Sequence, residues 1–256
     1  MTSSFYDHLA PHYHLLYGDW EGAIQHQGQA LAALLAEEGV QPGDPVLDAA
    51  CGIGTQTLGL LAHGHRVIAS DISPAAVQRL QAELQRRSLV AQAGVDDLRT
   101  LARVASASMA AVLACDNSVP HLLTDADLLA CFRQAHRCLR PGGSLVISVR
   151  DYAAIVRKTP DVHPYGMRRG ADGSRFIAVQ VWEWDGDHYD LRMYLTTEAP
   201  DGSCTTSVAT SRYYAVSIER LSALMREAGF ADVQRRDDVL FQPVLVGRAP
   251  RQGLAR

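Results

Sequence analysis

Apolar residues recur at helical spacing in some segments of the chain and form short continuous runs in others. Ala30, Leu31, Leu34 and Leu35 lie on one face of a helix predicted at 25–38. Short apolar runs predict strands at 45–50, 66–70, 89–93, 109–115 and 145–149. The helices expected between them are 56–63, 74–87, and one from about 124 to the Leu139-Arg140-Pro141-Gly142-Gly143 segment. This alternation is typical of an α/β fold with a doubly wound, mostly parallel, Rossmann-like sheet.

The pattern changes after residue 150. Strand-like runs at 176–184 and 188–195 flank Asp185-Gly186-Asp187, whose Asp-Gly sequence is typical of a hairpin turn. The later elements expected are a strand at 205–214, a helix at 217–228 and strands at 231–236 and 241–247. We therefore expect three parts: an N-terminal helical lid at 1–24, a main domain at 25–150 and 215–256, and an antiparallel β insertion at 151–214 that covers the substrate.

Three tyrosines lie near the N-terminus. Tyr6, Tyr13 and Tyr17 are spaced i, i+7 and i+11, which predicts that they share one helical face with Leu9. Ordinary core packing explains such a face, and a lid over a ligand would use the same face.

Composition and charge exclude several classes of protein. Of the 256 residues, 47% are hydrophobic and 20% are charged, which is enough to bury a full core. The net charge is −4 without a basic run, so we expect neither a nucleic acid nor a membrane as partner. No apolar stretch approaches ~18 residues and no signal-peptide pattern is present, so the expected location is cytoplasmic.

The cysteines and histidines give no clear metal site. The five cysteines include no Cys-x-x-Cys pair and are expected to be reduced thiols. His8 and His12 have the i, i+4 spacing of metal ligands, but no carboxylate or cysteine partner is evident. We therefore expect no metal.

A glycine-rich turn follows the first predicted strand. Asp48 precedes the turn, Gly52 and Gly54 lie in it, and Asp71 ends the next strand. Such a turn lets backbone approach a ligand, and the second carboxylate can accept hydrogen bonds from ribose hydroxyls. A dinucleotide needs a third glycine where Thr57 stands, and Asp48 would repel its pyrophosphate. S-adenosylmethionine has an ammonium group and no phosphate, so it fits better; a dinucleotide site or a structural turn is the alternative.

Polar residues also follow three later strands. Asp96 and Asp97 could accept from an adenine amino group or form only an exposed acidic turn. The fourth strand leads into Asp116-Asn117-Ser118-Val119-Pro120-His121-Leu122, at the edge where parallel sheets place reacting groups. This segment lacks the Asn/Asp-Pro-Pro-aromatic string of enzymes that methylate amino groups of bases. Arg150 ends the fifth strand and can bind a carboxylate in a planar, bidentate way, or pair with Asp151.

These residues resemble the class I S-adenosylmethionine-dependent methyltransferases and, within them, the glycine and glycine/sarcosine N-methyltransferases. The glycine turn and Asp71 carry the general resemblance. The segment from Cys115 to Leu122 is similar to the Gly-Asn-Ser-x-x-His-Leu string of that group, and Arg150-Asp151-Tyr152-Ala153-Ala154-Ile155 is similar to its Arg-Asn-Tyr-x-x-Ile. Tyr6, Tyr17 and Arg212-Tyr213-Tyr214 also fall in similar places. The sequence departs from the group at Asp116, which replaces a glycine, and at Asp97, which replaces a frequent tryptophan.

The resemblance implies a role for each residue. Asp71 and Asp96 would hold ribose and adenine, and Asp48, Gly52 and Gly54 would surround the methionyl part. The residues expected to bind the cofactor S-adenosylmethionine are Asp48, Ala50, Gly52, Gly54, Asp71, Ile72, Asp96, Asp97, Cys115 and Tyr13. The expected catalytic residues are His121, as proton acceptor, Asn117 and Tyr17. The expected substrate-binding residues are Arg150, Tyr6, Tyr152 and Tyr214.

The expected function is methyl transfer to a small-molecule substrate, for which three hypotheses stand. The first is N-methylation of a small amine or amino acid such as glycine or sarcosine, favoured by Arg150. The second is methylation, at nitrogen or an activated carbon, of a larger natural-product amine or indole, with Phe176, Trp182 and Trp184 lining a larger pocket unless they form core. The third is a non-catalytic S-adenosylmethionine-binding regulator. A homo-oligomer is left open.

Overall fold

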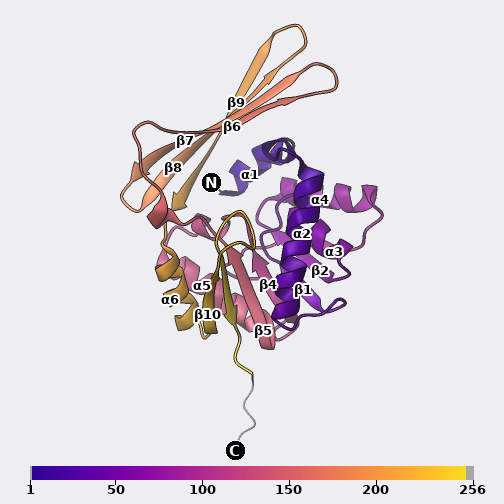
Figure 1. The fold of residues 1–256 in the computed structure, drawn as a ribbon, viewed down its shortest axis with the longest axis vertical. Coiled ribbons are helices and arrows are strands. Elements are labelled where there is room, and N and C mark those ends of the chain that lie inside the picture. The colour runs from indigo at the N-terminus through magenta and orange to yellow at the C-terminus, as the bar shows by residue number, and fades with distance from the viewer. Residues whose placement is uncertain (1, 252–256) are drawn as a thin grey trace, which may run out of the picture.

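The computed structural model describes residues 2–251, and a mostly parallel sheet of seven strands forms its centre (Figure 1). The sheet order is β10-β11-β5-β4-β1-β2-β3. Its strands are β1 (Pro45–Asp48), β2 (Arg66–Asp71), β3 (Gln92–Val95), β4 (Met109–Ala114), β5 (Leu139–Ser148), β10 (Ala231–Arg236) and β11 (Val244–Arg248). Strands β1 to β5 pair in parallel, whereas β11 is antiparallel to both β5 and β10. The carboxyl ends of the parallel strands therefore meet at one edge, where ligands of such sheets bind.

Helices cover both faces of this sheet. Successive strand residues point to opposite faces, so Val46 and Leu47 of β1 enter different hydrophobic clusters. The cluster of Val46 contains residues of α2 (Trp20–Glu37) and α3 (Thr55–Ala62), and α4 (Pro74–Arg86) packs beside these two helices. The cluster of Leu47 contains residues of α5 (Asp125–Cys138) and α6 (Ile218–Glu227). Between residues 2 and 251, no helix is both long enough and apolar enough to cross a membrane.

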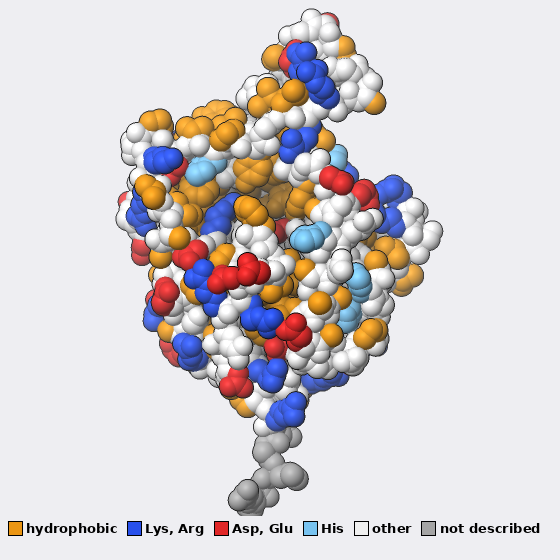
Figure 2. Space-filling view, in the orientation of Figure 1, with side chains coloured by type: hydrophobic (Ala, Val, Ile, Leu, Met, Phe, Trp, Pro, Cys, Tyr) orange, Lys and Arg blue, Asp and Glu red, His pale blue; other side chains and the backbone are white. Residues whose placement is uncertain are grey.

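A second sheet of four antiparallel strands projects from the main domain (Figure 1). Its strands, in spatial order, are β6 (Asp161–Arg169), β7 (Arg175–Asp185), β8 (His188–Glu198) and β9 (Cys204–Tyr214). Strand β6 is absent from the sequence expectation because Pro164 and Gly166 interrupt its pattern, and its register with β7 shifts between Pro164 and Met167. A deep, largely hydrophobic recess opens beneath this sheet (Figure 2).

The N-terminal segment lies between the two sheets (Figure 1). It forms helix α1 (Thr2–Leu9) and the short 3₁₀ helix η1 (Tyr13–Leu16). The expected single helical face through Tyr6, Tyr13 and Tyr17 is therefore wrong, because α1 ends before Pro11. Asp7 ties α1 to the start of α4, accepting a hydrogen bond from Ser73 Oγ at 2.6 Å.

Two strands begin later than their apolar runs predict. Strand β3 starts at Gln92 rather than 89, since Val90 is exposed in the preceding loop. Strand β11 starts at Val244 rather than 241, and Phe241 is fully exposed. In both cases apolar residues next to a strand belong to a loop, which hydrophobicity alone does not reveal.

Candidate functional site

The turn after β1 brings backbone to the edge of the sheet. Gly52 has φ +51° and Gly54 has φ +101°, in the left-handed region that favours glycine. A Cβ at Gly54 would lie 2.4 Å from Leu80 Cδ1, whereas a Cβ at Gly52 would meet nothing within 4 Å. Gly54 therefore serves the turn and its packing, and Gly52 leaves open space for a ligand beside the backbone.

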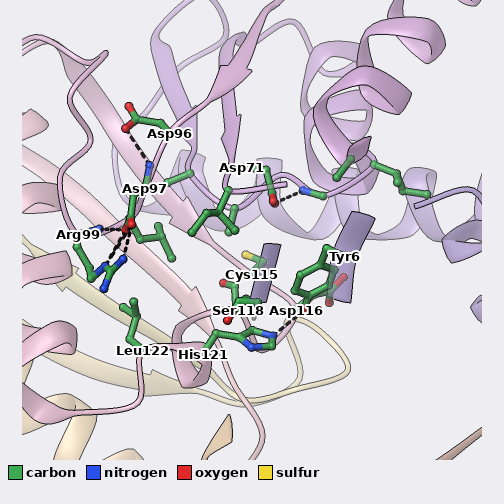
Figure 3. A pocket seen from close by; sticks show the side chains of 18 of the residues that line it. Tyr6, Asp71, Asp96, Asp97, Arg99, Cys115, Asp116, Ser118, His121 and Leu122 are labelled. Carbon is green, nitrogen blue, oxygen red and sulfur yellow. Dashed lines mark hydrogen bonds and ion pairs between the residues drawn. The ribbon is translucent and has the colours of Figure 1, made fainter. Parts of the chain in front are cut away.

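A cavity of about 280 Å³ lies beside this turn (Figure 3), and we call it the turn cavity. The residues predicted to bind a cofactor that line it are Ala50, Gly52, Asp71, Ile72, Asp96, Asp97, Cys115 and Tyr13. Asp48 and Gly54 do not line it. Asp96 and Asp97 lie toward one end, and Tyr6, Asp116 and His121 toward the other (Figure 3). The strand-end rule thus brings together most of the residues chosen from the sequence.

Asp71 is held in place by backbone amides. The amide of Gly52 donates to Oδ2 at 2.8 Å, and the amide of Ser73 donates to Oδ1 at 2.9 Å. Burial raises the pKa of Asp71, and these amide donors act in the opposite direction. Because each carboxylate oxygen can accept a second hydrogen bond, Asp71 keeps acceptor capacity at the cavity wall.

Asp96 and Asp97 lie at the opposite end of the turn cavity from His121 (Figure 3). The amides of Ala102 and Arg103 donate to Asp96 at 3.1 and 2.9 Å. Asp97 pairs with Arg99, whose Nη2 lies 2.6 Å from Oδ2, and the hydrogen bond from Arg99 lowers the pKa of Asp97. Both acids therefore make the loop contacts of an acidic turn and also line the cavity.

Asp48 is fully buried next to the wall residues Ala49 and Ala50. Thr57 Oγ1 donates to its Oδ2 at 2.6 Å. Its Oδ1 is also buried and has no hydrogen-bond partner in the described part of the chain. Burial raises the pKa of Asp48 to about 7. A buried acceptor without a donor is costly, so this oxygen is a group that a donating or cationic ligand would satisfy.

A second cavity, of about 480 Å³, lies under the four-stranded sheet, and we call it the cover cavity. Its apolar lining is Phe5, Leu9 and Leu16 of the N-terminal segment, Met193 of β8, and Phe241 of the loop before β11. Its polar lining includes Tyr17, Asp116, Asn117, Arg150 and Gln180. The cover cavity meets the turn cavity at Tyr6, Tyr13 and Asp116, which line both.

Arg150 lines the cover cavity without a carboxylate partner. It forms no ion pair with any residue from 2 to 251, and Asp151 pairs instead with Arg235 at 2.8 Å. The alternative of an Arg150–Asp151 ion pair is therefore wrong. The guanidinium carbon lies 5.3 Å from the ring centroid of Trp182, a cation–π contact that stabilises the charge only in part. An arginine in this state can take up an anionic group.

Asn117 connects the ends of β4 and β5. It has φ +62°, and its Oδ1 accepts from the amide of Arg150 at 3.0 Å. Its Nδ2 donates to Tyr152 Oη at 2.8 Å, and that oxygen lies 3.0 Å from Tyr189 Oη. These bonds use the polar atoms of Asn117 to position Arg150.

His121 lies in the wall of the turn cavity, opposite Tyr213 of β9. Its Nε2 is 2.8 Å from Tyr6 Oη, its Nδ1 is 3.3 Å from Ser211 Oγ, and its ring centroid is 4.0 Å from that of Tyr213. Burial lowers the pKa of His121 to about 3. The imidazole is therefore neutral near pH 7, and both ring nitrogens have partners.

Several residues lie elsewhere than the sequence suggested. Tyr152 is buried in the Asn117 network, and Tyr214 donates to Asp125 at 3.0 Å; neither lines a cavity. Phe176, Trp182 and Trp184 likewise line neither cavity, and the first two are core residues. Sequence reasoning named Asp116 and Tyr213 but assigned them no site role, and it did not select the sheet residues Tyr165, Gln180 and Met193. The signal for Asp116 was its place just after β4.

Residues 2–251 contain no group of three or more His, Cys, Asp or Glu side chains arranged to hold a metal ion.

Comparisons with known proteins agree with this arrangement. Residues 46–143 match a protein-family model described as a methyltransferase domain. This part of the chain is similar to methyltransferase domains, as the resemblance to the class I S-adenosylmethionine-dependent methyltransferases predicts. The predicted resemblance to methyltransferases and the predicted fold class are thereby confirmed.

Two curated relatives match part of this chain. A glycine/sarcosine N-methyltransferase of Parasynechococcus marenigrum is 28% identical over 138 residues, which cover 54% of this chain and 48% of the relative. A carboxy-S-adenosyl-L-methionine synthase of Escherichia coli is 30% identical over 125 residues, which cover 46% of this chain and 49% of the relative. The chain thus spans about half the length of these curated relatives.

Solved structures match over more of the chain. DesVI of Streptomyces venezuelae has a TM-score of 0.77 at 18% identity and covers 89% of this chain and 92% of its own. The CcbJ methyltransferase of Streptomyces caelestis has a TM-score of 0.76 at 18% identity, covering 98% and 99%. The sugar N-methyltransferase KedS8 of Streptoalloteichus has a TM-score of 0.74 at 19% identity, covering 89% and 88%. At such identities the similarity establishes the fold alone.

Proposed function

We propose that this protein transfers a methyl group from S-adenosylmethionine to the nitrogen of a small molecule. The observation that carries the proposal is the junction of the turn cavity and the cover cavity at Tyr6, Tyr13 and Asp116. Methyl transfer from a sulfonium is an in-line displacement, so donor and acceptor need adjoining sites that fix their relative orientation. Two cavities that share a wall are an arrangement of this kind.

The turn cavity is the proposed site of S-adenosylmethionine, which when bound supplies an activated methyl group. Asp71 has spare acceptor capacity for ribose hydroxyls, and the open space beside Gly52 admits a ligand close to the backbone. The unpaired Oδ1 of Asp48 adjoins the wall and would be satisfied by a donor on the ammonium end of the ligand. Asp96 and Asp97 would then lie at the adenine end.

The cover cavity is the proposed site of the acceptor. Its volume of about 480 Å³ lies in the range of cavities that hold drug-sized ligands, and glycine would fill only part of it. Proteins of the same fold include a sugar N-methyltransferase and an amino pentose methyltransferase, whereas the glycine/sarcosine enzyme matches over half its length. We therefore favour an amine larger than glycine or sarcosine.

The proposed roles of the polar residues follow from their contacts. Arg150, which lacks a carboxylate partner, would bind an anionic group of the acceptor, and Asn117 would hold Arg150 in position. Tyr6, Tyr13 and Tyr17 would enclose the junction. An imidazole with a pKa of about 3 is a poor proton acceptor, so we assign His121 the task of holding Tyr6.

The N-terminal segment 1–24 and the insertion 151–214 are the proposed cover of the site. They supply most of the apolar lining of the cover cavity, which excludes water from the acceptor. Residues 25–150 and 215–256 are the proposed cofactor-binding domain.

The proposal is tested with purified protein, methyl-labelled S-adenosylmethionine and a panel of amines and amino acids. We expect S-adenosylmethionine to bind and at least one amine to accept label at nitrogen, as located by mass spectrometry. An Asp71→Asn variant, which loses the carboxylate charge, should bind S-adenosylmethionine more weakly. Transfer to carbon only, or binding without transfer to any amine, would contradict the proposed N-methylation.

A further inference from the structure

Asp116 lies where the two cavities meet, and the resemblance to N-methyltransferases assigns it no role. It lies two residues after the end of β4 and has φ +55°. Its Oδ2 accepts from Tyr17 Oη at 3.0 Å and from Gln56 Nε2 at 3.1 Å. No residue from 2 to 251 donates a hydrogen bond to its Oδ1. One oxygen is therefore fixed, and the other is available at the junction.

The contacts that orient Asp116 are all uncharged. Gln56 Nε2 also donates to Gln27 Oε1 at 2.7 Å, and Tyr17 Oη accepts from Thr55 Oγ1 at 3.3 Å. Within the described chain, Asp116 forms no ion pair with a lysine, arginine or histidine. Its negative charge is held firmly by neutral donors but is not compensated by a cation, which suits a carboxylate that awaits a cationic ligand.

A second uncompensated charge lines the same cavity. Arg150 has no carboxylate partner in the described residues, and its backbone amide donates to Asn117 Oδ1 at 3.0 Å. Tyr13 lies within the field of both charges: burial raises the pKa of Tyr13, Asp116 raises it further, and Arg150 acts in the opposite direction. The rest of the lining includes the apolar side chains of Phe5, Leu9 and Met193. The cover cavity thus combines one anion, one cation and an apolar surface.

We propose that Asp116 binds the acceptor nitrogen and that the acceptor is an amino acid with a large apolar side chain, whose carboxylate pairs with Arg150. This inference rests on the proposed N-methyltransferase function. An amino group and a carboxylate on one molecule match the two charges, and the apolar side chain matches the remaining surface. The carboxylate at Asp116 replaces a glycine of the resembling group, so this acceptor site differs from theirs.

The chemistry gives Asp116 a defined task. The ammonium group of the amino acid first loses a proton to solvent. The nitrogen lone pair of the resulting neutral amine forms the N–C bond while the C–S bond breaks, and the electron pair of the C–S bond stays on sulfur as a neutral thioether. The positive charge moves onto nitrogen, next to Asp116, and a solvent base removes the N–H proton after release. Asp116 accepts a hydrogen bond from the amine, which orients its lone pair, and stabilises the charge that develops there.

The substrate class is tested with L-leucine, L-methionine, L-phenylalanine and L-tryptophan beside their amino alcohols, which lack the carboxylate. We expect kcat/KM to be at least about 100-fold higher for the best amino acid than for its alcohol, because the half-buried guanidinium of Arg150 would be left without an anionic partner. Equal rates on both, or no transfer to any of these compounds by protein that binds S-adenosylmethionine, would overturn the inference. Failure to bind S-adenosylmethionine would instead overturn the proposed function.

The role of Asp116 is tested with Asp116→Asn and Asp116→Gly, the latter free of strain at φ +55°. We expect kcat/KM to fall about 100-fold in both, with the dissociation constant of S-adenosylmethionine changed less than about threefold. The matched control is Asp187→Asn, an exposed carboxylate on the β7–β8 hairpin, which should retain full activity.

An inhibitor separates the amine contact from general damage to the cavity. 3-Phenylpropionate has the carboxylate and apolar group of phenylalanine but no amine. Its inhibition constant should be unchanged in Asp116→Asn and raised at least about tenfold in Arg150→Met. A rise of the same size in both variants would show that Asp116 acts on the cavity as a whole and would overturn its assignment to the nitrogen.

Discussion

The hydroxyl of Tyr6 lies 2.8 Å from Nε2 of His121 and connects helix α1 to the loop that follows β4. Strand β9 completes the contact, because the ring of Tyr213 lies 4.0 Å from that of His121 and Ser211 Oγ lies 3.3 Å from Nδ1. Three segments far apart in the sequence therefore meet at one imidazole. Tyr6 also lines both cavities, so this hydrogen bond positions part of their shared wall.

Tyr6→Phe should lower the turnover number kcat about tenfold. The variant leaves a buried nitrogen of His121 without a partner, a loss of about 1–3 kcal/mol, and loosens the wall at the junction. Tyr214→Phe is the matched control, since that hydroxyl bonds Asp125 outside both cavities. Steady-state release of S-adenosylhomocysteine measures both variants. Similar losses in the two would show that the Tyr6–His121 contact has no special place in the reaction.

The buried imidazole of His121 predicts a loss of stability in acid. Burial lowers its pKa from 6.5 to about 3, so the folded protein binds fewer protons than the unfolded chain between these values. The contribution of neutral His121 is fully present above pH 6.5 and is lost as the pH falls below it. Between pH 7 and 5, the wild type should lose about 2 kcal/mol relative to His121→Gln in urea unfolding.

Parallel unfolding curves for wild type and His121→Gln over this pH range would mean that the imidazole is hydrated. The rate profile provides a second check. If His121 is neutral throughout, the pH dependence of kcat between pH 6 and 9 should have the same shape in the wild type and in His121→Gln.

Asp48 predicts a pH dependence of the opposite sign. Burial raises its pKa from 3.8 to about 7, so the folded protein binds more protons than the unfolded chain between these values. Stability is therefore lost as the pH rises from 3.8 to 7, and the loss is complete above pH 7. Asp48→Asn removes this charge. Relative to the wild type without cofactor, it should gain about 3 kcal/mol in the free energy of unfolding between pH 5 and 8.

The control for Asp48 is Asp187→Asn, which removes an exposed carboxylate that pairs with His188. A wild type that keeps its stability up to pH 8 relative to Asp48→Asn would show that the Asp48 carboxylate is solvated or paired.

The main sheet could be predicted because each of its elements has a local cause. Ser73 caps α4 by accepting from the amide of Ala76 at 3.1 Å, and Pro74 occupies the first turn, a start signal visible in the sequence. The carboxyl ends of parallel strands then place Asp71, Asp96 and Asp116 at one edge of the sheet, independently of the loop conformations. Donor-site residues chosen by this rule mostly line the turn cavity.

The acceptor side could not be predicted in the same way, because its wall comes from the packing of distant segments. Tyr213 lines the cover cavity while its neighbour Tyr214 points away, a difference of one residue that depends on the register of β9 with β8. Strand β6, which contains Tyr165, could not be predicted because Pro164 and Gly166 interrupt its sequence pattern. Arg150 lacks a carboxylate partner because its neighbour Asp151 pairs with Arg235, which is 84 residues further along the chain.

Alanine substitutions at Gly54 and Gly52 should separate fold stability from cofactor affinity. Ala at Gly54 would combine φ +101° with a 2.4 Å approach to Leu80 Cδ1, so Gly54→Ala should destabilise the fold by about 2–4 kcal/mol.

Ala at Gly52 would meet no protein atom within 4 Å, and its strain at φ +51° should cost only about 1 kcal/mol. Its methyl group, however, would occupy space at the wall of the turn cavity. Gly52→Ala should therefore weaken S-adenosylmethionine binding at least about tenfold while most of the stability remains, as calorimetry and urea unfolding would show. If both variants bind the cofactor as the wild type does, the ligand does not approach the backbone at this turn.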